Sequence, residues 1–591
     1  MTVVKGLFHE LRRRRVFRMT AVYIIASWVI LQVADLLFPA LGIEEIALRY
    51  VWITLVLGFP MAVLFSWRYD IGSGGITRTV RVGDAVAESL ALRKSDYFIL
   101  LVLLAIAVFT VSTMTQRVVE EKAAIDIAPQ TRDIDPHSLA VLPLENLSPE
   151  PAQAYFATGM YDSLISSLSR VHALRVTSRT SASRVDTAIG IPEIGRKLGV
   201  ANVIEGSVFR EGNRVRISVK LIDTASDQYL WTETYERDFD DVMAIQASMA
   251  RSVARAIEAT LSVEDEQRLA RSLTIKPETF EAYLRAMFSF RTETQEGYME
   301  GIEILEEALA NDPTSALAHA ALGQGYSELL HGAMPMAEAT RRARAATEKA
   351  LELDPTLAEA HLALGLYRLY GEIDWKGSEE NFRRAMELNP SMADAWYHWA
   401  WWLEIGGVDD EAIAAGEKAV ELSPLSSYYI SWLADQYRDA GEYDKAIELA
   451  ESVLDLDPDY PVALYARGNA YLELEHFDEA IATHEKISQS PRWAPALAHS
   501  YAWAGQPDKA LEIAQSYEHI PGNALALTEI YAALGDADKA VYWIKQLRDT
   551  GNPMYVGVFG WYTATRSLHK DPRIQAMAQE AGLPLTPYPK D

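Results

Sequence analysis

Three stretches within the first 115 residues are almost continuously apolar. They run over 19–38, 50–67 and 97–114. Each is long enough to cross a lipid bilayer as a helix, so the sequence predicts a membrane region with three transmembrane helices over residues 1–115. Residues 116–137, which mix charges and two prolines, predict a linker.

The basic residues around these stretches predict an orientation. Six lysines and arginines precede the first stretch and five lie between the second and third, whereas acids dominate the segment between the first two. Basic segments remain in the cytoplasm, so a bacterial inner-membrane protein is expected, with its N-terminus in the cytoplasm and residues 116–591 in the periplasm. The first stretch is also compatible with a signal peptide, but no small-residue cleavage pattern follows it promptly. Asp35 lies near the end of that stretch, where an interfacial carboxylate is favoured over a proton relay.

Residues 138–265 change repeatedly between the alternating pattern of strands and the spacing of helices. Strands are expected at 138–144, 174–177, 202–210, 214–222 and 228–237, and helices at 151–171, 192–198 and 240–261. Helices and strands that mix over so short a segment predict a compact α+β domain.

The remaining pattern is helical, rich in alanine and regularly punctuated by proline. The punctuating dipeptides are Asp312-Pro313, Asp354-Pro355, Asn389-Pro390, Ser423-Pro424, Asp457-Pro458 and Ser490-Pro491. Successive prolines are 42, 35, 34, 34 and 33 residues apart, and a helical period near 34 is typical of tetratricopeptide repeats. The sequence therefore predicts an all-α superhelical solenoid over 277–550 and a C-terminal cap over 551–591.

Small residues recur where the two helices of each repeat must cross closely. The first set is Gly323, Gly365, Ala400, Ala434, Gly468, Ala498 and Thr528, and the second is Ala343, Ala412, Ala446, Ala480, Ala510 and Ala540. Tyrosines follow the first crossing at 326, 437, 471, 501 and 531 and are expected to pack there. His319 and His361, at the leading position of helix A, are expected to be packed rings.

The α+β segment also carries a family resemblance. Its residues 139–148, 155–160, 174–181, 204–208 and 230–237 resemble the TolB-like amino-terminal domain, which tetratricopeptide repeats often follow. Residues 13–18, 33–35 and 59–60 are similar to the membrane part of bacterial proteins with this architecture. The resemblance implies the order of the domains but assigns no function.

Composition narrows the function further. The chain carries 82 acidic and 55 basic residues, a formal charge of −27, which opposes binding to nucleic acids. The absence of cysteine excludes disulfides and thiolate chemistry. Phosphate loops, zinc-protease motifs and nucleophile elbows are also missing. We therefore expect no enzyme, no cofactor and no metal site, and the glycine-rich segment 72–75 is expected to be a flexible turn.

The inner groove of the solenoid is the candidate binding site. Helix A positions expected to face this open groove are Tyr397, Trp401, Asp435, Arg438, Tyr465 and Asn469. The neighbouring Trp396, Trp399, Trp401 and Trp402 exceed what one helix pair needs for its core, so one or two of them are expected to be exposed anchors. The alternative, in which all four are packed, stays open. Paired cations that would grip a terminal carboxylate are not evident there.

Outside the solenoid, Arg175, Arg179, Thr180 and Ser181 form a polar cluster. A salt bridge at the end of a strand is favoured there over an anion site. Together these features predict an inner-membrane scaffold or adaptor that binds protein or peptide partners in its groove, binds lipid through three helices, and performs no catalysis. The alternative is an envelope sensor whose outer domains bind a ligand and signal through the spans. An enzyme would require a site without a known motif in the TolB-like domain.

Overall fold

The computed structural model describes most of the chain beyond residue 133. The residues it describes are 134–583 without 150–153, 272–274, 292–293, 330–335, 491, 521, 561–564 and 566, together with 23, 27, 31, 55, 69–72 and 75–78. The chain divides into two compact units, residues 1–127 and 128–591.

The first unit contains a β-hairpin. Strands β1 (Tyr69–Gly72) and β2 (Gly75–Arg78) pair antiparallel, with Tyr69 opposite Arg78 and Gly72 opposite Gly75. The glycine-rich segment that the sequence predicts as a flexible turn therefore begins and ends in paired strand residues.

The structure corrects the fold class predicted for the N-terminal region. In the part of the chain that is described, no helix has both the length and the apolar character that a bilayer crossing requires. The longest described helix is α13 (Met336–Leu353), which has 18 residues and carries arginine, lysine and glutamate side chains along its length. The stretches 19–38, 50–67 and 97–114 lie outside the described residues, except for four isolated positions. The fold that is described is an α+β domain followed by an all-α solenoid.

The α+β domain is built on a mixed sheet with the strand order β5-β3-β6-β7-β8, in which β4 also pairs with β6. Strand β3 is parallel to β5 and β6, whereas β6, β7 and β8 form antiparallel pairs. The strands are β3 (Ser138–Val141), β4 (Glu145–Asn146), β5 (Arg175–Val176), β6 (Asn202–Glu211), β7 (Arg214–Asp223) and β8 (Gln228–Asp238). The three long strands confirm the predictions at 202–210, 214–222 and 228–237.

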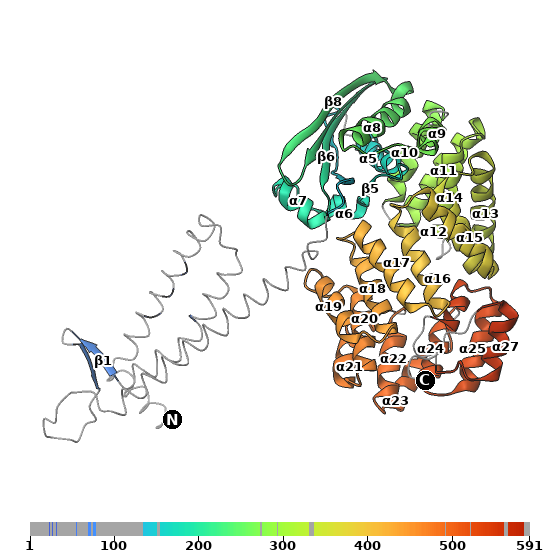
Figure 1. Cartoon of the computed structure of the whole chain (residues 1–591). Coiled ribbons are helices and arrows are strands. Elements are labelled where there is room, and N and C mark those ends of the chain that lie inside the picture. The colour runs from blue at the N-terminus through green and yellow to red at the C-terminus, as the bar shows by residue number, and fades with distance from the viewer. Residues whose placement is uncertain are drawn as a thin grey trace. The chain divides into compact units, whose positions relative to one another are not determined.

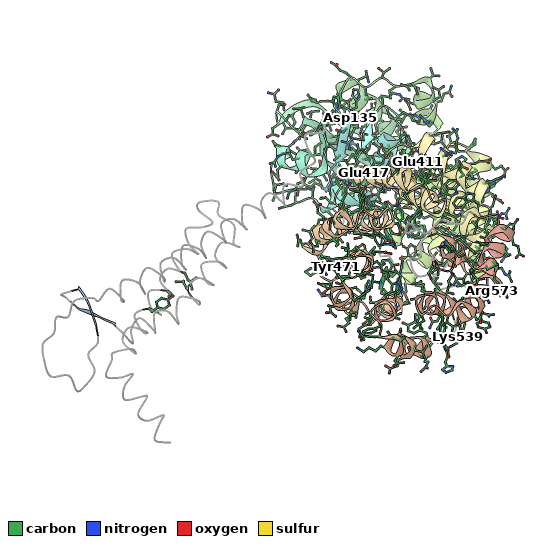
Figure 2. The ribbon with its side chains drawn as sticks, turned by 60° about the horizontal axis from the view of Figure 1, so that its bottom comes forward. Asp135, Glu411, Glu417, Tyr471, Lys539 and Arg573 are labelled. Atoms are coloured by element: carbon green, nitrogen blue, oxygen red, sulfur yellow. The ribbon has the colours of Figure 1, made fainter. Side chains whose placement is uncertain are left out.

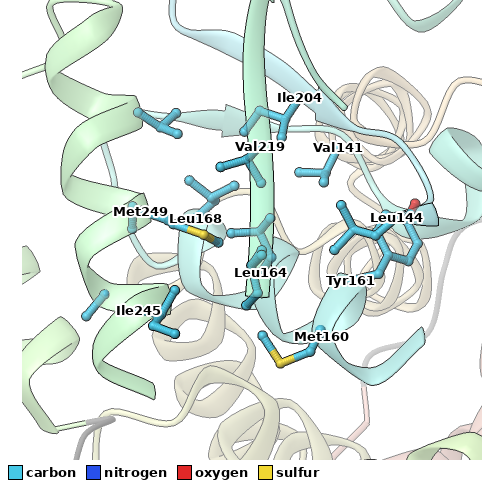
Figure 3. Packing of buried hydrophobic residues seen from close by; sticks show 14 of the residues in the cluster. Val141, Leu144, Met160, Tyr161, Leu164, Leu168, Ile204, Val219, Ile245 and Met249 are labelled. Carbon is cyan, nitrogen blue, oxygen red and sulfur yellow. The ribbon is translucent and has the colours of Figure 1, made fainter. Parts of the chain in front are cut away.

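Helices cover both faces of this sheet. Helices α5 (Ala154–Ser169) and α8 (Val242–Ala256) bury one face, where Leu164 and Leu168 pack among Ile204, Val219 and Ile245 (Figure 3). Helices α6 (Arg179–Arg184) and α7 (Ile191–Leu198) lie on the other face, in a second cluster that includes Ala140, Ile194 and Val203. Full burial of such side chains typically contributes about 1.5–3 kcal/mol each, which explains why the sheet is the centre of this domain.

The solenoid follows as a series of antiparallel helix pairs, preceded by α9 (Val263–Arg271) (Figure 1). The first helices of the pairs, called A helices here, are α10 (Pro277–Phe290), α12 (Ala316–Glu328), α14 (Ala358–Tyr367), α16 (Ala393–Ile405), α18 (Ser427–Asp439), α20 (Pro461–Glu473), α22 (Ala494–Trp503) and α24 (Ala524–Ala533). Their B helices are α11 (Gln295–Asn311), α13, α15 (Trp375–Leu388), α17 (Asp409–Leu422), α19 (Tyr443–Leu454), α21 (Phe477–Glu485), α23 (Pro507–Tyr517) and α25 (Ala537–Asp549).

The crossing residues pack as the sequence predicts. Ala400, Ala434, Ala446 and Ala480 are completely buried. A methyl group added to Gly468 would lie 2.2 Å from Nε2 of the next helix's histidine, so only glycine fits this crossing. The prediction that small side chains permit close helix crossing is confirmed.

Two hydrogen-bond patterns recur along the repeats. At the start of helix A, the rings of His319, His361 and Trp396 donate to the carbonyl oxygens of Pro313, Pro355 and Pro390, at 3.1, 2.9 and 2.8 Å. These two histidines are therefore packed rings, as expected.

The second pattern involves the tyrosines after the first crossing. The Tyr437 hydroxyl donates to Glu417 of the preceding B helix at 2.6 Å, and Lys445 lies 3.8 Å from the centre of the ring; Figure 2 labels Glu417. Tyr531 has the same arrangement with a glutamate and with Lys539, whose ammonium is 4.3 Å from the ring centre. Each such tyrosine thus joins neighbouring helices through both its hydroxyl and its ring.

The α+β domain contacts the turns between repeats. The Val176 amide donates to Ser391 Oγ at 3.0 Å, and the Ser178 amide donates to the Leu422 carbonyl at 2.7 Å. The β5 edge of the sheet is therefore covered by the solenoid at these positions.

The end of the solenoid returns to its middle. After α25 the chain forms a 3-10 segment, η6 (Pro553–Phe559), and then α27 (Pro572–Ala581). Val556, Val558 and Phe559 are buried in one cluster with Ile405, and η6 contacts α16. We call this contact between η6 and α16 the closure.

An irregular segment lies beside the closure. Helix α14 continues into a π-helical turn, η5 (Arg368–Glu372), followed by Ile373 at φ 56°. A β-branched residue in the left-handed region is strained and persists only where its surroundings hold it. Ile373 packs against the cluster that contains η6, so the irregular backbone belongs to the surface on which the array closes.

Candidate functional site on the inner face of the array

The A helices of the central repeats contribute a continuous row of aromatic side chains. Its members are Tyr397 and Trp401 of α16, Tyr428 and Trp432 of α18, Tyr465 of α20 and Trp493, which caps α22. Ring centres are 5.0 Å apart for Trp401 and Trp432, 6.4 Å for Trp432 and Tyr465, and 5.1 Å for Tyr465 and Trp493. We call this row the aromatic row.

Most of the aromatic row keeps some accessible surface. Tyr428 is 40% exposed, and Trp401, Trp432, Tyr465 and Trp493 are partly buried. Tilted and edge-to-face contacts of this kind stabilise the rings against one another. The row is therefore rigid and still offers aromatic faces and edges to a ligand.

The six residues predicted to face the groove lie together, but most are buried. Tyr397, Asp435, Arg438 and Asn469 are 3%, 5%, 2% and 3% exposed. Trp401 and Tyr465 keep accessible surface. The groove is thus less open than expected. The four buried side chains form the wall behind the accessible rings, and partner contact through them stays a prediction.

The four clustered tryptophans divide between the two interpretations. Trp399 and Trp402 are buried and stacked, with ring centres 4.8 Å apart, and Trp402 also stacks on Trp375 at 4.2 Å. Trp396 and Trp401 remain partly accessible. Two of the four tryptophans therefore fill the core. The alternative interpretation expected all four to do so.

A buried charge cluster lies in the wall of the inner face. Arg438 Nε is 2.8 Å from Asp435 Oδ1, and Arg438 Nη1 is 2.6 Å from Asp439 Oδ1. Burial alone would lower the pKa of Arg438, but Asp435 and Asp439 raise it well above its usual value. Glu404 of α16 completes the group, because its carboxylate oxygen and those of both aspartates lie within 4.8 Å of one another. Three carboxylates at this spacing have the geometry of a cation site. The Arg438 guanidinium already supplies a positive charge there.

A further carboxyl group, that of Glu529 in α24, belongs to the same region. It contributes to the field that raises the pKa of Tyr465, after burial and Asp435. Burial raises the pKa of Glu529 to about 8, although its side chain keeps accessible surface.

The histidines of the inner face are neutral at physiological pH. Burial lowers the pKa of His398 and His484 to about 4 and that of His499 to about 3. His484 Nδ1 is 2.7 Å from Ser500 Oγ. These rings therefore contribute hydrogen bonds and packing, not charge, to the inner face.

The polar cluster of the α+β domain forms salt bridges. Arg175 Nη1 is 3.5 Å from Glu421 Oε1 of the solenoid, and Arg179 Nε is 3.6 Å from Asp162 Oδ1. The Leu425 amide donates to Ser181 Oγ at 2.9 Å. The favoured interpretation as a salt bridge is confirmed, with the addition that the cluster attaches the domain to the solenoid.

The sequence analysis missed Glu404, Asp439 and Glu529. Asp439 had a local signal, because Asp435, Arg438 and Asp439 are spaced so as to meet on one side of a helix. Glu404 and Glu529 had none, since they reach the inner face from helices of other repeats. Their position depends on how the repeats stack.

Family models match three segments of the chain. The second domain of HilA/YgeH-like transcriptional regulators matches residues 135–252, a tetratricopeptide repeat matches 368–427, and anaphase-promoting complex subunit 3 matches 407–487. The first match covers the α+β domain, and it does not identify that domain as TolB-like.

Two curated relatives share parts of the chain. A putative adenylate cyclase 3 from Rhizobium meliloti is 35% identical over 186 residues, 31% of this chain and 32% of the relative. Anaphase-promoting complex subunit 3 from Schizosaccharomyces pombe is 24% identical over 114 residues, 19% of this chain and 17% of the relative. The chain thus spans a third or less of either relative.

Solved structures are similar in part. Pseudomonas aeruginosa PilF has a TM-score of 0.29 at 20% identity, covering 38% of this chain and 99% of PilF. Yeast Tom70 has a TM-score of 0.32 at 15% identity, covering 58% of this chain and 82% of Tom70. Together with the proline period and the paired helices, the family models identify the helical array as tetratricopeptide repeats, an architecture for binding other proteins.

Proposed function

We propose that the protein is a non-catalytic scaffold that binds a protein partner on the inner face of its tetratricopeptide array. The single observation that carries this proposal is the aromatic row, with partly accessible rings on four successive A helices. Trp401, Trp432 and Trp493 are its largest members. Tryptophan and tyrosine are the residues most enriched among those that dominate binding energy.

The buried wall supports this role by fixing the rings. The Tyr397 hydroxyl is 2.8 Å from the Tyr428 hydroxyl, and Tyr429 donates to Asp394 at 2.5 Å. A surface held in place in this way loses little conformational entropy when a partner binds. Rigid, partly exposed aromatic side chains are therefore suited to recognition.

Catalysis is not part of the proposal. Most titratable groups of the inner face are either paired, as Arg438 is with Asp435 and Asp439, or are uncharged histidines; Glu529 is an exception. No nucleophile lies beside a base of suitable pKa among the groups described for this face. The activity named for the Rhizobium relative belongs to a protein of which this chain spans a third.

The test compares capture of partners by three versions of the full chain. Trp401→Ala and Trp432→Ala together remove two central rings, while Tyr542→Ala removes a tyrosine that is 54% exposed on α25, a B helix. Proteins retained by the unmodified chain and by Tyr542→Ala, but lost by the double variant, are inner-face partners. If the double variant retains the same proteins at the same level while remaining folded by circular dichroism, the proposal is wrong.

The compartment and the α+β domain complete the proposal. On the distribution of basic residues before position 116, we place residues 116–591 in the periplasm of a bacterium. A reporter fused at residue 125 that is active only in the cytoplasm would overturn this placement. We keep the TolB-like assignment of residues 138–265 as a proposal on the sequence resemblance.

A further inference from the structure

We propose that residues 554–560 act as an internal ligand of the inner face, and that an apolar segment of the partner binds there by displacing them. This inference rests on the proposed function, and it names the chemistry of the partner and a control on its binding. It is carried by the contact of η6 with the side of α16 that also holds the aromatic row.

The first observation is the position of Ile405 on α16. Tyr397, Trp401 and Ile405 follow one another at intervals of four residues, which places them along one side of the helix. The rings of Tyr397 and Trp401, both members of the aromatic row, have centres 5.1 Å apart. Ile405, the last residue of α16, is completely buried in the closure. The side of α16 that begins in the aromatic row therefore ends under η6.

The second observation is how closely the C-terminal segment approaches α16. A methyl group added to Gly560 would lie 2.6 Å from Ile405 Cα and 3.2 Å from both Cβ and Cγ1 of the same residue. Trp401 packs against the same cluster of apolar side chains that contains Val556 and Phe559. No second segment fits into so close a contact, because protein interiors are packed as densely as organic crystals. A partner that extends along the aromatic row to the end of α16 must therefore displace η6.

The third observation is the apolar character of the contact. Residues 554–560 carry no charged side chain. Val556 and Phe559 are completely buried, and Val558 is 1% exposed. The side chains of the array that pack against this cluster include Tyr370, Ile373, Trp375 and Trp401. An apolar segment gains free energy by leaving water for these surroundings, whereas a charged one would have to give up its hydration. The partner segment is therefore apolar, with a small residue where it approaches α16 as closely as Gly560 does.

The fourth observation is that the closure is built from short, irregular backbone. The η6 segment is a 3-10 helix, in which hydrogen bonds are poorer than those of an α-helix. It contacts the π-helical turn η5, which is followed by Ile373 in the left-handed region. Strain at such a residue persists only where surrounding contacts hold it. Release of η6 removes some of those contacts, so displacing this segment costs less than displacing a regular helix of the array.

The experiment measures binding of a fluorescein-labelled peptide with the sequence of residues 554–560 to the full chain by fluorescence anisotropy. A control peptide has serine at the positions of Val556, Val558 and Phe559. The apparent affinity of a site falls with the fraction of molecules in which the site is open. Gly560→Ala weakens the closure, typically by roughly 5- to 150-fold in its equilibrium constant. We therefore expect Gly560→Ala to bind the peptide at least about fivefold more tightly than the unmodified chain does, and neither to bind the serine peptide.

Further variants show where the peptide binds and whether the closure controls its binding. In the Gly560→Ala background, Trp401→Ala is expected to weaken peptide binding about tenfold. Met299→Ala, which removes a side chain that is 52% exposed on α11, is expected to stay within about twofold. Phe559→Ala opens the closure by removing contacts instead of adding a clash, so it should raise the affinity as Gly560→Ala does. If the folded opened variants bind the peptide no more tightly than the unmodified chain, or do not bind it, the inference is overturned.

Partner capture separates this inference from the proposed function. We expect Gly560→Ala to retain more of the inner-face partners than the unmodified chain does. If it retains the same amount or less, while Trp401→Ala with Trp432→Ala still abolishes capture, the displacement inference is wrong and the scaffold proposal stands. If the double variant keeps those partners, the scaffold proposal is wrong even where the peptide displaces η6. A dimer of Gly560→Ala in sedimentation that dissociates when the free peptide is added would mean that a second copy occupies the site, and would overturn the choice of a different protein.

Discussion

The closure of the array on itself makes a sharp prediction at Gly560. A methyl group added to Gly560 would lie 2.6 Å from Ile405 Cα and 3.2 Å from Ile405 Cβ. Ile405 is completely buried, so it cannot move aside without displacing helix α16. Gly560→Ala is therefore expected to separate η6 from α16 while leaving the rest of the array folded.

The size of the effect follows from the overlap. Nonbonded carbons are most stable about 3.5–4.0 Å apart, so the added carbon overlaps the α16 backbone by about 1 Å. Overpacking of this kind typically costs about 1–3 kcal/mol. If this cost lowers the free energy needed to open η6 locally, the protected amides there exchange roughly 5- to 150-fold faster.

Hydrogen exchange measured on the full chain tests this prediction. Amides in residues 554–560 are expected to exchange faster in Gly560→Ala, while those of α22 and of the α+β domain keep their protection. Gly190→Ala is the control, because its added methyl would meet only Pro192 Cδ at an ordinary 3.7 Å. Unchanged protection of 554–560 in Gly560→Ala would refute the closure.

Two further predictions concern the wall of the inner face. Gly468→Ala should lower the free energy of unfolding by about 1–3 kcal/mol in urea titrations, because the buried His484 ring is bonded to Ser500 and cannot yield. Gly416→Ala would meet the ends of two flexible side chains, Gln436 Oε1 at 2.1 Å and Leu433 Cδ1 at 3.0 Å, so it should cost less; equal losses would contradict this reasoning. The pKa of Glu529 is about 8 in the folded chain and 4.5 in the unfolded chain. The free energy that Glu529 contributes to folding therefore falls as pH rises from 4.5 to 8. Glu529→Gln should therefore be more stable than the unmodified chain by about 2–4 kcal/mol at pH 8.5. At pH 4.5 the two should be nearly equal in stability, as measured by denaturation at each pH. A difference that does not change with pH would show that Glu529 is not buried as described.

Local patterns were sufficient to predict the helices of the array. Proline ends each B helix, and small residues such as Ala446 and Gly468 permit the crossing within each pair. These signals act over a few residues, so they survive in the sequence as a period. The strands of the α+β domain were predicted for the same reason, because Arg214–Asp223 alternates over most of its length and a short turn joins it to Asn202–Glu211.

The closure and the charge cluster could not be predicted from the sequence. Both depend on the small rotation between each repeat and the next, and these rotations accumulate along the array. Ile405 meets η6 only because the superhelix brings residues far apart in sequence into contact. Glu404 reaches Asp435 and Asp439 only because α16 and α18 stack at a particular angle. The accumulated rotation between repeats also explains why the predicted groove residues Tyr397 and Arg438 are buried rather than open to solvent.

The polarity of the inner face is not explained by stability alone. Burying Glu404, Asp435, Arg438 and Asp439 requires their desolvation, and replacing such clusters by apolar side chains is often neutral or stabilising. Glu529 adds an unpaired acid that destabilises the folded chain at neutral pH. An array that only had to fold would therefore lose little by having an apolar inner wall. A charged wall behind a row of partly accessible aromatic rings instead fits a surface whose role is recognition as well as folding.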